Sequence, residues 1–151
     1  MKWYSTRDQK REHGQSLREA VMMGLAPDGG LFVPERIPQA DLSEAERRAD
    51  ESYASLTTYL AGLFFDGDLD PQEIARQLAS LYDFPVPLRR VGDRRYTLEL
   101  FHGPTCAFKD FGAGFMGRMT GLLDRGGERL VILTATSGDT GSAAAHGFYN
   151  V

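Results

Sequence analysis

The feature that most constrains the fold is a buried-strand pattern near the end of the chain. Residues 129–135, RLVILTA, contain a nearly continuous apolar run, which is typical of a strand buried on both faces in a parallel sheet. The tight turn TSGDTG follows at 136–141, and SAAAHGFYN then begins a helix. Together with the strand and helix that precede it, this unit forms a strand–helix–strand–helix series and predicts an α/β fold with an open parallel sheet.

The same pattern limits how much of that sheet the sequence contains. The sequence reaches Val151 just after this strand–helix unit, and two or so parallel strands cannot make a sheet that is covered on both faces. We therefore expect either a piece of a longer protein or a chain that needs a partner to cover exposed apolar surface.

The first half of the chain predicts a small, mostly helical unit with short strands. KWYST alternates like a strand, and SLREAVMMGL places Leu17, Val21 and Leu25 on one helical face. Ser43 and Glu46 have the spacing of a capping box at the start of the next helical stretch. Two further helices are expected to bury apolar stripes, formed by Tyr53, Leu56, Leu60, Leu63 and Phe64 in the first and by Ile74, Leu78 and Leu81 in the second.

The second of these helices has a clear start signal, and the pattern changes soon after it ends. Asp70 is suited to the N-cap and Pro71 to the first helical position. Beyond Phe84, PVPLRRVGDRRYTLELF predicts two strands around a Gly92-Asp93 turn. We therefore expect a first domain over 1–84 and the beginning of a second over 85–151.

Charge and cysteine content exclude several classes of function. The formal net charge of −4 argues against a general nucleic-acid-binding surface. The one basic cluster, Arg89, Arg90, Arg94 and Arg95, is interpreted as a solvated hairpin rim rather than an anion site.

A single cysteine, Cys106, makes no intrachain disulfide and suits a reducing compartment. No signal peptide, membrane span or metal-ligand pattern is visible, so a cytoplasmic protein without a metal site is expected.

Lys109, in HGPTCAFKDFG, is the first candidate for chemistry. Its neighbours Ala107, Phe108 and Phe111 could desolvate the amine, which disfavours its charged form and lowers its pKa. A deprotonated lysine can form an imine with an aldehyde. The residues alone leave a second interpretation open, in which Lys109 is an ordinary lysine in the first turn of a helix with its charge in water.

The helix after Lys109 has an unusual face without side chains. Gly114, Gly117 and Gly121 lie on it, and each interior glycine costs about 1 kcal/mol relative to alanine. Close approach of another helix, a sheet or a flat ligand would explain such a face. The sequence leaves tight packing and ligand binding open.

The turn at Thr136–Ser142, TSGDTGS, is a candidate anion-binding loop. A strand leading through a glycine turn into a helix leaves backbone N–H groups unpaired, and the helix dipole favours an anion there. Ser137, Thr140 and Ser142 add hydroxyl donors. The loop matches neither the Walker A nor the dinucleotide-binding pattern, and an ordinary helix cap remains the alternative. His102 could contact a ligand, although a structural hydrogen bond is the simpler interpretation.

The two motifs taken together closely resemble a known family. LELFHGPTCAFKDFGAGFMGRM and ILTATSGDTGSAAAHGFY are similar to threonine synthase, a pyridoxal-phosphate enzyme family of fold type II, the tryptophan synthase β-like group. YSTRD and GLAPDGGLFVPE near the amino terminus are similar to the same family. The resemblance implies a small mixed amino-terminal domain followed by the start of an open parallel-sheet domain that binds the cofactor.

The resemblance also implies roles for residues. Lys109 would hold pyridoxal 5'-phosphate as an internal aldimine, and Ser137, Gly138, Asp139 and Thr140 would face the cofactor ring and the α-carboxylate of the substrate. The reaction implied is conversion of O-phospho-L-homoserine and water to L-threonine and phosphate. The loops expected to hold the cofactor phosphate and the substrate phosphate would belong to the remainder of the chain beyond Val151. Cys106 stands where a leucine is common in the family.

Two other functions remain open at this point. One is a related lyase or dehydratase of the same fold type. The other, for the 151-residue chain alone, is a non-catalytic anion-binding or interaction module, which the missing phosphate loop favours. The sequence does not determine an oligomeric state.

Overall fold

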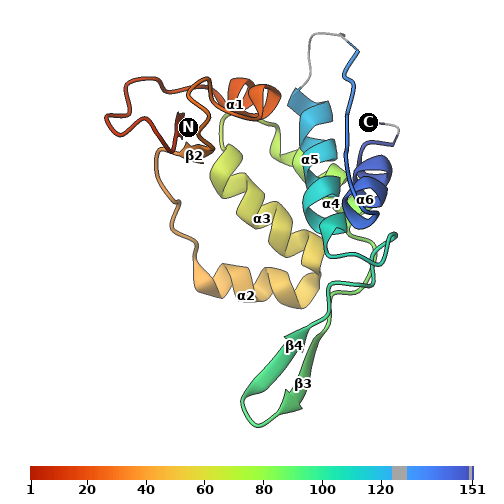
Figure 1. The fold of residues 1–151 in the computed structure, drawn as a ribbon. Helices are drawn as coiled ribbons and strands as arrows, with labels where there is room; N and C mark the ends of the chain where they lie inside the picture. Colours follow the sequence, from red (N-terminus) through yellow and green to blue (C-terminus); the bar gives the residue numbers. More distant parts are fainter. Residues whose placement is uncertain (124–128, 150) are drawn as a thin grey trace.

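The computed structural model describes residues 1–123, 129–149 and 151. Its elements follow one another along the chain as short strands and helices of up to four turns (Figure 1). They are β1 (Trp3–Ser5), α1 (Leu17–Met23), β2 (Phe32–Pro34), α2 (Leu42–Glu51), α3 (Tyr53–Phe65), α4 (Pro71–Leu81), β3 (Leu88–Gly92), β4 (Arg95–Leu98), α5 (Lys109–Leu123) and α6 (Asp139–Gly147).

Local capping explains where several helices begin. Ser16 and Glu19 form a reciprocal capping box at α1, and the Asp70 side chain accepts from Gln72 N at α4, where Pro71 takes the first position as predicted. The predicted capping box of Ser43 and Glu46 is wrong. Helix α2 begins one residue before Ser43, because the Asp41 carboxylate accepts from the N–H groups of Ser43 and Glu44 and caps the helix there.

The hydrophobic core lies between α1, α3, α4 and α5. Leu17, Ile74 and Leu78 are its fully buried large side chains, as the periodicity predicted for α1 and α4. The predicted stripe of α3 is partly wrong: Ala61 and Phe65 are its buried residues, whereas Leu60 is 36% exposed. Leu25 is also exposed, because α1 ends at Met23 and Gly24 turns the chain away.

Helix α5 completes this core from the second half of the chain. Met119 and Leu123 are buried in the same cluster as the residues of α3 and α4. Phe111 stacks on Tyr82 at a centroid distance of 5.8 Å and meets Tyr53 edge-on at 5.5 Å. The helix that begins with Lys109 is therefore anchored to the amino-terminal helices by aromatic contacts.

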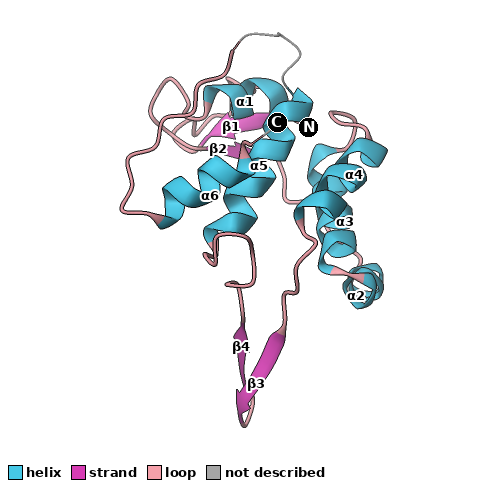
Figure 2. Ribbon diagram, turned by 90° about the vertical axis from the view of Figure 1, so that its right-hand side faces the viewer, coloured by secondary structure: helices cyan, strands magenta, loops and turns pink. Residues whose placement is uncertain are grey.

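Both sheets that the described residues form are two-stranded and antiparallel. β1 pairs with β2, with Trp3 opposite Pro34. β3 pairs with β4 around a turn at Asp93 and Arg94, one residue later than predicted, because Gly92 pairs with Arg95. In both views the β3–β4 hairpin projects away from the helices (Figures 1 and 2). Leu88, Val91, Tyr96 and Leu98 are exposed, because none of the described helices packs against the hairpin.

The predicted parallel sheet is not seen in the described residues. Residues 129–136 run as an extended segment beside α5 and α6 without a strand partner, and Leu133 is 90% exposed. The burial on both faces predicted for this segment is therefore wrong here, since a strand of a parallel sheet is buried only when neighbouring strands flank it. The predicted end of the glycine-rich helix, at 124–127, lies outside the described residues. None of the described helices is long and apolar enough to cross a lipid bilayer.

Candidate functional site

Lys109 is the first residue of α5 and is partly buried. Its ammonium group lies over the ring of Phe108, with Nζ 4.3 Å from the ring centroid. The side chain therefore rests on the ring of Phe108, which is itself exposed, whereas Phe111 stacks on Tyr82. This position leaves the amine accessible to a reagent or a ligand.

The segment before Lys109 is a closed turn. Cys106 N donates to Gly103 O at 3.0 Å, and Asp110 N donates to Ala107 O at 3.0 Å. Cys106 takes a left-handed conformation with φ of 58°, a region that favours glycine, and its thiol is exposed. A non-glycine residue keeps this conformation only where surrounding contacts hold it.

Asp110 supplies those contacts and was not singled out in the sequence. Its side chain is 4% exposed and accepts from Thr105 twice, from the backbone N at 2.9 Å and from Oγ1 at 2.5 Å. The Thr105–Asp110 interaction can be recognised only in the folded chain, where the carboxylate is buried and lies next to its two donors. Asp110 thus joins the turn to the first residues of α5.

The glycine face of α5 packs against protein. A β-carbon added at Gly117 would lie 2.8 Å from the carbonyl carbon of Gly147 in α6, and one at Gly114 would lie 2.5 Å from Cδ1 of Leu81. At Gly121 the neighbour is Val151. Of the two explanations open from the sequence, close helix packing accounts for this face.

The loop Ser137–Thr140 lies at the amino-terminal end of α6 and is exposed. Gly138 is the N-cap, with φ of 151°, and no side chain caps the helix. Gly138 N donates to Thr136 Oγ1 at 3.2 Å. The first N–H groups of α6 therefore face outward at the positive end of the helix dipole, an arrangement that suits an anion.

The structure places the two motifs at the starts of neighbouring helices, Lys109 at α5 and the Ser137–Thr140 loop at α6. Helix α6 contacts α5 through Gly147, at the carboxyl-terminal end of α6. The Ser137–Thr140 loop lies at the opposite end of α6, which extends away from α5 in Figure 2. Lys109 begins α5, and the glycines that contact α6 lie one turn and more further along. The predicted roles of Lys109, Ser137, Gly138, Asp139 and Thr140 remain predictions.

A polar cavity of about 450 Å³ lies beside the turn that leads to Lys109. His102, Arg118 and His146 line it together with Asp83, and Arg118 Nε is buried without a hydrogen-bond partner among the described residues. His102 Nε2 lies 2.7 Å from Glu99 Oε2, which fits the structural hydrogen bond favoured for it. Arg118 and His146 were not predicted as site residues, because only the packing of α5 on α6 brings them together.

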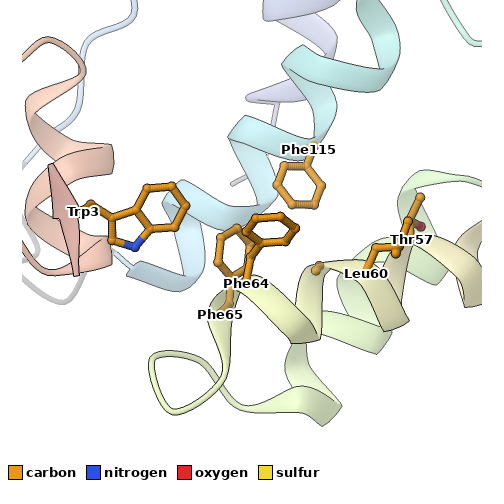
Figure 3. Close-up of a pocket in the computed structure, with 7 residues that line it drawn as sticks. Trp3, Thr57, Leu60, Phe64, Phe65 and Phe115 are labelled. Atoms are coloured by element: carbon orange, nitrogen blue, oxygen red, sulfur yellow. The ribbon is translucent and has the colours of Figure 1, made fainter. Parts of the chain in front are cut away.

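The amino-terminal half contains apolar cavities of a different kind. The one in Figure 3, of about 280 Å³, lies between Trp3, α3 and Phe115. A neighbouring cavity of about 410 Å³ shares Trp3, Phe65 and Phe115 with it. Their walls offer almost no polar groups, so they provide no catalytic side chains. Within the described residues no three His, Cys, Asp or Glu side chains form a metal-binding group.

Comparison with known proteins gives one consistent result. A family model described as "Threonine synthase N terminus" matches residues 2–82. The chain is 41% identical to threonine synthase of Haemophilus influenzae over 93% of its length and 40% identical to that of Escherichia coli over its whole length. It covers 32% and 35% of those two proteins, so it spans about a third of the length of these relatives.

Solved structures agree with the sequence comparison. The crystal structure of threonine synthase from Escherichia coli matches 99% of the chain with a TM-score of 0.87 at 36% identity, over 34% of that protein. Threonine synthase from Brucella melitensis, solved with pyridoxal phosphate bound, matches 98% of the chain with a TM-score of 0.86 at 35% identity, over 33% of its own length. The described arrangement of helices is therefore that of the amino-terminal third of these enzymes.

Proposed function

Because the chain belongs to the threonine synthase family, whose amino-terminal part it matches, we propose that it supplies the cofactor lysine and the substrate-carboxylate loop of a threonine synthase. The proposed reaction converts O-phospho-L-homoserine and water to L-threonine and phosphate. The observation that supports the proposal is the extent of the likeness, which covers 99% of the chain in structure and the whole chain in sequence.

Lys109 fits a role as the residue that binds the cofactor aldehyde. Its amine lies over Phe108, 4.3 Å from the ring centroid, and its backbone is fixed at the start of a helix that is packed into the core. When bound, pyridoxal phosphate acts as an electron sink for the substrate carbons. Once the amine of the substrate has displaced Lys109 from the aldehyde, the freed Lys109 amine would carry protons between those carbons, while phosphate leaves Cγ and water adds at Cβ.

The loop Ser137–Thr140 fits a role in holding the substrate carboxylate. The outward N–H groups of α6 and the hydroxyls of Ser137 and Thr140 are donors, and the helix dipole adds a favourable field. Asp139, in the first turn of α6, is expected to face the cofactor ring. The domain division at residue 84, the cytoplasmic location and the completion of the pocket by the remainder of the chain beyond Val151 belong to the same proposal.

A chimeric enzyme tests the proposed activity. This chain replaces the matching third of Escherichia coli threonine synthase, and the chimera is expressed in a strain without that enzyme. We expect growth without threonine and release of phosphate from O-phospho-L-homoserine, and we expect Lys109→Ala to abolish both. A folded chimera without activity, or an active Lys109→Ala chimera, would contradict the assignment.

The alternative for the isolated chain, an anion-binding module, has the exposed amino terminus of α6 in its favour. It predicts that the chimera is inactive although the 151-residue chain binds inorganic phosphate. Phosphate titration followed by NMR of the Ser137–Thr140 amides distinguishes the two functions.

A further inference from the structure

Asp110 is the only buried carboxylate in the part of the chain that the structure describes. It is 4% exposed and takes part in none of the ion pairs found among those residues. Burial of a carboxylate is costly unless hydrogen bonds compensate for lost water. Here both oxygens are used: Oδ2 accepts from Thr105 N and Oδ1 from Thr105 Oγ1. A buried carboxyl group whose two oxygens are both bound by one residue points to a specific role in this turn.

The backbone around Asp110 is shaped to receive its side chain. A β-carbon at Gly103 would lie 2.5 Å from Asp110 Oδ2 and 3.1 Å from its Cβ, so only glycine allows the turn to close on the carboxylate. Cys106, between the two anchored residues, is held in the left-handed region. The hydrogen bonds at 2.9 Å and 2.5 Å therefore hold a strained turn in place.

Lys109 lies inside the segment that these hydrogen bonds close. The segment begins at Thr105, ends at Asp110 and contains the backbone bond from Asp110 N to Ala107 O at 3.0 Å. The Asp110 carboxylate thus ties down the backbone on both sides of Lys109, at Thr105 and at Asp110 itself. Without the carboxylate, Cys106 can leave its left-handed conformation. The turn then changes shape, and the Cα of Lys109 moves with it.

We propose that Asp110, acting through Thr105 and the close approach of Gly103, is a positioning residue that fixes where the amine of Lys109 points. This inference rests on the proposed function, in which Lys109 binds the aldehyde of the cofactor. Asp110 itself contacts neither substrate nor cofactor in this proposal. A misplacement of about 1 Å is enough to lower the rate of an oriented reaction by as much as about 100-fold.

The chain offers internal controls for a test, because its only lysines are Lys2, Lys10 and Lys109. The folded 151-residue chain is treated with pyridoxal phosphate, reduced with borohydride and digested, and the adduct on each lysine is measured by mass spectrometry. The readout is the ratio of the labelling rate of Lys109 to those of Lys2 and Lys10, which are exposed and distant from the turn in sequence.

Four variants separate positioning from general stability. Asp110→Asn and Thr105→Val each remove part of the hydrogen-bonded closure, and we expect each to lower the ratio about 10-fold. Thr105→Ser keeps the hydroxyl and is expected to retain the wild-type ratio. Asp70→Ala removes the cap of α4, lowers stability without touching the turn, and is expected to leave the ratio unchanged.

The outcomes distinguish this inference from its premise. If Lys109 in the wild-type chain reacts no faster than Lys2 and Lys10, the turn does not direct the amine and the inference fails, whereas the proposed function is tested separately by the activity of the chimera. If the wild type is selective but Asp110→Asn and Thr105→Val are equally selective, the inference alone is overturned. A loss of selectivity in Asp70→Ala or Thr105→Ser equal to that in Thr105→Val would also overturn it, since the ratio would then follow stability.

Discussion

Gly117 allows the closest approach between α5 and α6, and replacing it with alanine tests the packing directly. The new β-carbon would lie 2.8 Å from the Gly147 carbonyl carbon and nearer still to its oxygen. Carbon atoms normally approach to about 3.5–4.0 Å, so the helices must separate by about 1 Å. Both obstructing atoms belong to the backbone and cannot rotate away, so the overpacking cost is expected at about 3 kcal/mol, the upper end of the usual range.

Helix propensity partly offsets that cost. Alanine is favoured over glycine by about 1 kcal/mol within a helix, which leaves a net destabilisation of about 2 kcal/mol for Gly117→Ala. Gly112 in the same helix is the matched control, because an added β-carbon there meets no atom within 4 Å. Gly112→Ala is therefore expected to stabilise the chain by up to about 1 kcal/mol.

Thermal unfolding followed by far-UV circular dichroism measures both variants. At about 2–4 °C per kcal/mol for a chain of this size, Gly117→Ala is expected to lower Tm by about 4–8 °C and Gly112→Ala to raise it by up to about 4 °C. If Gly117→Ala unfolds at or above the wild-type Tm, the two helices do not meet at this point. Explanations of the glycine face that require an open surface, such as a flat ligand, would then be favoured again.

Two further predictions concern single side chains. Burial, with a smaller contribution from Tyr53, raises the pKa of Tyr82 above its ordinary value of 10.0. Because the folded state favours neutral Tyr82, this residue contributes its full stabilisation below about pH 10, the pKa in the unfolded chain. That contribution is lost as the pH rises from there toward the pKa in the folded state. Tyr82→Phe is expected to lose about 1 kcal/mol at neutral pH, with its hydrogen bond to Phe111 O, and to reduce the alkaline loss of stability in urea titrations from pH 8 to 11; an unchanged alkaline slope would refute the assignment. Cys106 has a left-handed backbone conformation, which glycine adopts without strain but alanine does not. Cys106→Gly is therefore expected to be about 1 kcal/mol more stable than Cys106→Ala in the same urea titrations. Equal stability of the two Cys106 variants would show that the turn is unstrained.

Local sequence signals identified much of the fold. Asp70 and Pro71 predicted the start of α4, and the 3.6-residue spacing of Ile74 and Leu78 predicted its buried face. The Gly92-Asp93 turn predicted the hairpin. Signals failed where two candidates competed within a few residues, as at Asp41 and Ser43, and where the face of α3 was decided by which helices pack against it.

Some residues of the candidate site could also be predicted from local sequence signals, and others could not. Lys109 and the Ser137–Thr140 loop could be selected from the sequence, since each combines a residue type with a local backbone pattern. Asp110 could not, because an aspartate in the first turn of a helix is ordinary until its partners at Thr105 and Gly103 are known. Arg118 and His146 belong to different helices, and no local pattern links them.

The sequence by itself indicated the family and predicted Lys109 as the candidate reactive residue and Ser137–Thr140 as the candidate anion-binding loop. Those properties depend on residues within about ten positions of one another, and short-range geometry is encoded locally. Only the tertiary structure decided that Gly117 of α5 receives α6, that Asp110 closes the turn before Lys109, and that residues 129–136 run unpaired and exposed among the described residues. These features depend on contacts between distant segments, and burial follows from which surfaces are present to cover a segment rather than from its hydrophobicity alone.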